Sequence, residues 1–339
     1  MSSCSSHIVY FDVLNILSCI AVIALHQNGI VHSFSPTAEW AESLIVEVVC
    51  YWAVPVFFML SGAKLLSYPE RYSTRAFLKR RFVKTFIPFI IWSLVWCAIY
   101  YNRSHSMPAD LLEIVTCIIQ TGYQPVYWFF IPLFGVYLLM PVLSLLRDNY
   151  KLIIYIELLI FICSGIIQPL ISILNWPEIS ILNNSLSMPI FYCLAGYYLS
   201  KCNLSRRFLF ILIICSVLCF LFRYFYTYYQ SFKLGYTDKT LFSLGYFTAV
   251  IPAITLFEGI KRIHFCFSAK TETIIKLLAS CSFGIYLVHM LVTKVCIYFL
   301  CIDVTSLIWR TLGIFFIYAI SLFVVFMSKK IKIGNYIFP

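Results

Sequence analysis

Ten apolar segments alternate with short polar segments along the whole chain. Each apolar segment is close in length to the roughly 20 residues that a helix needs to cross a bilayer. Because helices satisfy their own backbone hydrogen bonds in lipid, the pattern predicts an all-α polytopic membrane protein with about ten transmembrane helices. The predicted spans are residues 8–31, 43–66, 82–101, 125–146, 151–172, 185–200, 207–229, 241–260, 274–301 and 305–328.

The composition excludes a soluble protein. The 339 residues are 62% hydrophobic and only 12% charged, against about 25% charged in ordinary soluble domains. No long polar stretch interrupts the spans, so we predict one integral membrane domain over residues 1–339. The start, MSSCSSHIVYFDVL, lacks the basic region and the cleavage site of a signal peptide, so the first apolar segment should remain as a helix.

The distribution of charge predicts the orientation. Of the 25 Lys and Arg residues, 19 lie in the segments 64–84, 147–151, 201–207, 261–276 and 329–332. All five segments face the cytoplasm if the N-terminus does, and an excess of Lys and Arg marks cytoplasmic loops. Both termini are therefore predicted to be cytoplasmic. The net charge of +11 reflects topology, and we expect no nucleic-acid partner.

The cysteines do not suggest a disulfide framework. Most of the 14 lie within predicted spans, and neither a C-x-x-C pair nor a Cys/His cluster with zinc spacing occurs. We expect no structural disulfide and no metal site. The sequence also has no G-x-S-x-G motif and no Gly-rich loop of the kind that cradles phosphates.

A polar stripe in the first span is the main candidate site. At about 100° per residue, Asp12 lies within roughly 40° of His26 on the helix surface and about 21 Å below it, and Asn15 lies about 20° away. Titratable groups in a span are costly and usually functional. A neutral His bonded to a neighbouring helix is the alternative, but the shared face with Asp12 and Asn15 favours a wet or ligand-filled groove.

His289, in the segment SCSFGIYLVHM of the ninth span, is the second candidate. It lies about 23 Å from the inner end of its span, and His26 lies about 27 Å from the inner end of the first. The two imidazoles are therefore predicted at similar depth and can meet in one site. An imidazole suits the removal of a proton from a hydroxyl near neutral pH. Asp12 is too far away to orient His26, so its role should lie at the inner mouth.

A basic cluster follows the second span. Its members are Lys64, Arg75, Lys79, Arg80, Arg81 and Lys84. Membrane anchoring explains part of the cluster. The density of cations also fits a phosphate dock, for which coenzyme A has the right charge on the right side. Ser61 and Gly62 precede it and permit close backbone approach. Trp128 can cover a sugar ring, although the interfacial aromatic belt is the commoner role.

Several segments, in this order, resemble the membrane acyltransferase 3 family. They are FDVLNILSCIAVIALH, VPVFFMLSGAKLL, FLKRRFVKTFIPFIIW, YWFFIPLFGVYLLMPVL, LAGYYLS and CSFGIYLVHM. The resemblance covers nearly the whole chain. The compact form is similar to stand-alone O-acetyltransferases of bacterial surface glycans, including the enterobacterial common antigen type.

The resemblance implies a ten-helix enzyme of the bacterial inner membrane that moves an acetyl group from cytoplasmic acetyl-CoA to a glycan hydroxyl. The family's essential His corresponds to His26, and its basic motif corresponds to Arg81 and Lys84, with Arg80 adjacent. The family usually carries Arg eleven residues before the His, where this chain has Asn15. We expect catalysis by His26 and His289, and substrate contacts from Trp128 and Tyr286. The expected donor-binding residues are Asp12, Asn15, Ser61, Lys64, Arg80, Arg81 and Lys84.

Two other functions stay open at this stage. A transporter or flippase of a lipid-linked glycan also fits polar stripes and prolines within spans, although no paired broken helices occur in equivalent halves. A structural assembly partner would need neither His. The sequence specifies neither the sugar nor the hydroxyl that is modified, nor whether the donor is acetyl-CoA or another acyl-CoA, nor the oligomeric state.

Overall fold

The computed structural model describes residues 8–105, 107–108, 110–177, 186–331 and 334–338. In these ranges the chain forms helices and turns, without a β-strand. The predicted all-α class is therefore confirmed for the part that the structure describes. Residues 1–7, on which the absence of a signal peptide was argued, lie outside it, as do residue 185 of the sixth predicted span and Lys332 of the last basic segment.

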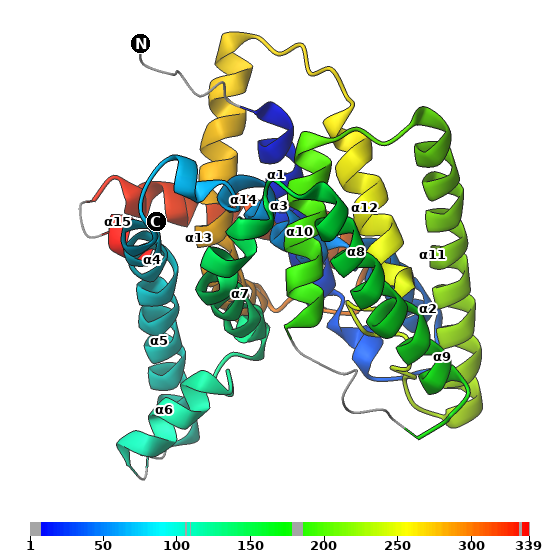
Figure 1. Cartoon of the computed structure of the whole chain (residues 1–339). Coiled ribbons are helices and arrows are strands. Elements are labelled where there is room, and N and C mark those ends of the chain that lie inside the picture. Colours follow the sequence, from blue (N-terminus) through cyan, green and yellow to red (C-terminus); the bar gives the residue numbers. More distant parts are fainter. Residues whose placement is uncertain (1–7, 106, 109, 178–185, 332–333, 339) are drawn as a thin grey trace.

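The helices form a bundle, with α11 on one flank and α5 and α6 on the opposite flank (Figure 1). The helices are α1 (Val9–Gln27), α2 (Ala38–Cys50), α3 (Ala53–Leu65), α4 (Thr74–Arg81), α5 (Ile87–Ser104), α6 (Leu111–Ile119), α7 (Phe130–Leu143), α8 (Tyr150–Ile160), α9 (Gln168–Ile173), α10 (Ser187–Lys201), α11 (Arg206–Leu234), α12 (Phe247–Lys261), α13 (Ala269–Leu300), α14 (Leu307–Lys329) and α15 (Gly334–Ile337).

The protein is a multi-pass membrane protein. In the described part of the chain, eight helical segments are long and apolar enough to cross a membrane. The spans predicted at 185–200 and 241–260 correspond to α10 and α12, which have 15 residues each. That is shorter than the roughly 20 residues of a full crossing. The count of ten crossings and the cytoplasmic location of both termini therefore stay predictions.

Three of the spanning segments are irregular. A turn at Tyr51 and Trp52 separates α2 from α3. A π-helical turn, Phe82–Phe86, joins α4 to α5, and a second, Phe161–Ile167, joins α8 to α9. Such turns insert an extra residue, redirect the side chains that follow, and are frequent at functional sites.

The centre of the bundle is tightly packed. Helix α1 packs against α3, α13 and α14, and α3 packs against α10. A Cβ added to Gly62 would overlap the carbonyl oxygen of Cys193, and one added to Gly196 would overlap that of Met59. The close backbone approach predicted at Gly62 is thus confirmed, and α10 is the helix that makes it.

Candidate active site

The structure brings the two membrane-embedded histidines together. Nδ1 of His26, on α1, lies 2.7 Å from Nε2 of His289, on α13. The two rings are nearly parallel, with an interplanar angle of 17° and centroids 5.0 Å apart. His289 is 1% exposed, whereas His26 is half-buried. The similar depths derived from the sequence therefore correspond to direct contact.

Hydrogen-bond chemistry determines which nitrogen of His26 is basic. Nδ1 of His289 lies 2.8 Å from the backbone oxygen of Tyr286, and a carbonyl oxygen can only accept. Nδ1 of His289 therefore carries a hydrogen, and burial favours the neutral ring, whose Nε2 is then an acceptor. It follows that Nδ1–H of His26 donates to His289. The lone pair of neutral His26 is left on Nε2.

Two further contacts hold α1 against α13. The amide Nδ2 of Asn15 donates to the carbonyl of Ala279 at 3.0 Å, and the thiol of Cys19 donates to that of Ser282 at 3.7 Å. In these two pairs and the His pair, the residue numbers rise in the same direction along both helices. Helices α1 and α13 therefore run parallel. The polar stripe of the first span therefore faces α13 at Asn15, instead of a groove.

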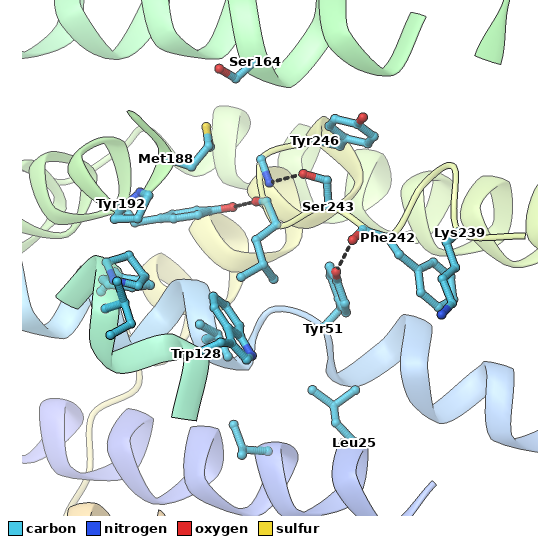
Figure 2. Close-up of a pocket in the computed structure, with 18 of the residues that line it drawn as sticks. Leu25, Tyr51, Trp128, Ser164, Met188, Tyr192, Lys239, Phe242, Ser243 and Tyr246 are labelled. Atoms are coloured by element: carbon cyan, nitrogen blue, oxygen red, sulfur yellow. Dashed lines mark hydrogen bonds between the residues drawn. The ribbon is translucent and has the colours of Figure 1, made fainter. Parts of the chain in front are cut away.

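A cavity of about 910 Å³ adjoins His26. This volume lies in the range of roughly 300–1,000 Å³ that is typical of ligand pockets. His26, Trp128 and Tyr286 line it, and so do Ser164 and Gln168 from the second π-helical turn and the start of α9. Figure 2 shows the part of the wall that α10 and the 239–246 loop contribute, together with Tyr51 and Trp128.

Comparison with known families bears directly on this arrangement. A family model described as an acyltransferase domain (Acyl_transf_3) matches residues 8–327. The chain belongs to this acyltransferase family. No curated protein matches, and neither does any solved structure. The match spans both His26 and His289, so the imidazole pair lies inside the acyltransferase domain.

Trp128 of this acyltransferase is fixed to the cavity wall by its neighbours. It belongs to a short 3₁₀ turn, Pro125–Phe129. The hydroxyl of Tyr127 donates to the carbonyl of Leu287 at 2.7 Å, and the hydroxyl of Tyr286 donates to the carbonyl of Val126. These reciprocal bonds attach the turn to α13. Trp128 itself stays 43% exposed, so its ring is available to a ligand.

The same bonds limit the roles of His289 and Tyr286 in the acyltransferase. The hydroxyl hydrogen of Tyr286 is used by Val126, and the ring hydrogen of His289 by the Tyr286 carbonyl. Neither side chain has a hydrogen left for an oxyanion in this geometry. Orientation of His26 is the role that suits His289, and a place in the cavity wall is the role that suits Tyr286.

The expected donor-binding residues on α1 and α3 lie towards the other end of α1. Asp12 is near enough to attract Lys64 electrostatically. Lys64 is exposed, and its ammonium lies 5.5 Å from the ring of Phe11. The hydroxyl of Ser61 donates to the carbonyl of Phe57 within its own helix at 2.9 Å. These side chains and Asn15 do not line the cavity at His26.

The remaining basic residues surround the first π-helical turn. The guanidinium of Arg80 lies 4.4 Å from the centroid of Tyr72, and that of Arg81 lies 5.7 Å from the centroid of Tyr137. Lys84 lies within the turn and is exposed. None of the three lines the cavity at His26. The basic face and that cavity are two distinct regions of the acyltransferase.

Sequence reasoning did not find partners for the intramembrane charges Glu47 and Arg223. They lie 3.9 Å apart, both almost fully buried, and the guanidinium of Arg223 stacks 3.6 Å from the centroid of Tyr51. Their opposite charges were the available signal, but 176 positions separate them, so the sequence did not indicate the pair. In the described residues, no group of three or more His, Cys, Asp or Glu side chains could hold a metal ion.

Proposed function

We propose that this acyltransferase moves an acetyl group from cytoplasmic acetyl-CoA to a hydroxyl of a cell-surface polysaccharide or lipid-linked glycan. Its setting would be the bacterial inner membrane, as for the stand-alone O-acetyltransferases, such as the common antigen type, that the sequence resembles. The observation that carries the proposal is the basic Nε2 of His26, oriented by His289, on a half-buried ring at the wall of a large cavity.

The proposed reaction needs one proton acceptor. Nε2 of His26 removes the proton of the acceptor hydroxyl, and the oxygen attacks the thioester carbonyl of the donor. The new C–O bond forms as the C–S bond breaks, and the proton passes from His26 to the departing thiolate. A short-lived acyl group on Nε2 is the alternative route with the same products. In both routes the bond from Nδ1–H to His289 stabilises the cationic or acylated ring of His26.

The donor is proposed to bind at the basic face. Lys64, Arg80, Arg81 and Lys84 supply the charge that the phosphates of coenzyme A require. Asp12, Asn15 and Ser61 lie near the route that the thioester arm would take along α1 towards His26. Asn15 carries no charge where the family usually has Arg, and its amide is bonded to α13, so more of the attraction for the donor should come from Lys64 and Arg80.

The acceptor is proposed to occupy the cavity at His26. Trp128 presents an exposed ring face that suits the C–H face of a sugar. Tyr286 closes the wall beside the imidazole pair. With α1 crossing from the cytoplasm outwards, as the charge distribution predicts, this cavity lies in the outer half of the membrane, where a surface glycan is accessible.

The test uses the purified protein in liposomes with labelled acetyl-CoA and surface glycan from cells that lack the protein. We expect His26→Gln to lower the turnover number by about 10³-fold, because the base is lost. His264→Gln is the matched control, since His264 is exposed and lies outside this cavity. Full transfer by the His26 variant would refute the proposal. Movement of lipid-linked glycan across the membrane without acyl-CoA would favour a flippase instead.

A further inference from the structure

One part of the cavity wall at His26, beside the 239–246 loop, carries exposed basic side chains. Lys239 and His32 both line the cavity there, and both are exposed. Two causes lower the pKa of His32 below its ordinary value. The larger is the partial burial of the ring, and the second is the positive charge of Lys239. The ring centroid of His32 lies 6.4 Å from that of Phe242, which follows Lys239 by three residues in the same loop and lines the same cavity. Figure 2 shows Lys239 beside Phe242.

The acid of the cavity does not neutralise Lys239. Glu47, the carboxylate residue in its lining, is 4% exposed and lies 3.9 Å from the guanidinium of Arg223. That guanidinium stacks on Tyr51 and Phe242, both of which also line the cavity. The Glu47 charge is thus offset by Arg223 behind the wall, and the Lys239 charge is the excess.

Lys239 has no ion-pair partner among the residues that the structure describes. The carboxylate of its neighbour Asp238 accepts a bond from Thr240 instead, at 2.7 Å. Two other cations outside the predicted cytoplasmic segments have partners. Arg310 bonds to Glu42 at 2.7 Å, and Lys294 lies 4.7 Å from the centroid of Trp96. Topology disfavours Lys in such positions, so neither topology nor pairing explains Lys239.

These observations point to the chemistry of the acceptor. We propose that the acceptor is an acidic glycan, and that Lys239 and His32 bind its oxyanion while another of its sugars lies at Trp128 and His26. A cavity whose excess charge has one sign concentrates ligands of the opposite sign. The ammonium offers three hydrogens and the imidazole one, which suits a carboxylate or phosphate group. This inference rests on the proposed function and specifies its acceptor.

The test compares neutral with acidic glycans as acceptors. Glycan from cells that lack the protein is separated into neutral and acidic fractions by anion exchange, and each is offered with labelled acetyl-CoA. We expect transfer to the acidic fraction. Lys239→Gln should raise KM for this fraction about tenfold, the loss of one hydrogen bond to a charged group, with kcat unchanged. Lys233→Gln is the matched control, because Lys233 is exposed near the same loop but does not line the cavity.

Each outcome has a defined meaning. Loss of transfer after amidation of the glycan carboxylates would identify a carboxylate as the anion, and its persistence would identify a phosphate. Transfer confined to the neutral fraction, or equal KM values for Lys239→Gln and Lys233→Gln, would overturn the inference and leave the proposed function standing. Absence of transfer to both fractions would instead overturn the proposed function, and this inference with it.

Discussion

At the scale of single residues, the position of one hydrogen organises the candidate site. A neutral histidine alone in water interconverts between two tautomers, and only one of them leaves the lone pair of Nε2 free. Here the carbonyl of Tyr286 fixes the tautomer of His289, and His289 fixes that of His26. Because both bonds join the rings to fixed backbone or to each other, His26 needs no carboxylate to orient it. Asp12, at the far end of α1, is therefore not required for this purpose.

The hydrogen bonds that join His26 to His289, and His289 to the Tyr286 carbonyl, predict a graded effect of changes at His289. His289→Leu removes the acceptor for Nδ1–H of His26, and we expect kcat to fall about 100-fold with little change in KM, because the base loses its orientation. His289→Gln keeps an acceptor oxygen and should recover part of the loss. Steady-state kinetics with acetyl-CoA as donor would measure both. Equal activity of the Leu variant and the unaltered protein would contradict the orienting role of His289.

At the scale of elements, close helix packing positions the cavity. The 51–52 turn and the second π-helical turn place Tyr51, Ser164 and Gln168 in its lining. The contact between α3 and α10 beside the cavity is close because glycines on both helices let the backbones touch. Small residues at helix contacts are typical of membrane proteins, where association depends on packing instead of the exclusion of water.

The contact between α3 and α10 predicts opposite effects of Gly→Ala changes. Gly62→Ala would force a methyl group into the carbonyl of Cys193, and we expect it to cost about 1–3 kcal/mol. Gly259→Ala, on α12, meets no atom within 4 Å and should be neutral or stabilising, since Ala favours helix more than Gly does. Thermal unfolding in detergent would compare them. A Gly62→Ala protein as stable as Gly259→Ala would show that the two helices are not in such close contact.

At the scale of the whole molecule, orientation is the property that matters most for function. The parallel packing of α1 and α13 agrees with spans that cross in the same direction, as the first and ninth of ten would. The cavity at His26 and the basic face lie towards opposite ends of α1. The function proposed above would bring a donor from one side of the membrane and an acceptor from the other together at the imidazole pair.

Two exposed native cysteines test this orientation. Cys266 precedes α13 and Cys301 follows it, so they lie at opposite ends of one spanning helix. With cytoplasmic termini, an impermeant maleimide applied to intact spheroplasts should label Cys301, and should label Cys266 only after permeabilisation. Mass spectrometry of labelled peptides would measure this, with Cys301→Ser and Cys266→Ser as controls. The reverse pattern would invert the topology and place the cavity on the cytoplasmic side.

The sequence by itself determined the class of the protein and singled out His26 as the main candidate for its site. Apolar length and charge distribution are local properties that lipid and water act on directly, so they predict a helical membrane protein, and His26 stood out as an ionisable group in lipid. Only the tertiary structure decided that His26 bonds to His289, that Asn15 faces α13, that Glu47 and Arg223 pair, and that Lys239 enters the cavity. These contacts join segments far apart in the sequence, and they depend on how helices rotate and pack against each other, which no local pattern specifies.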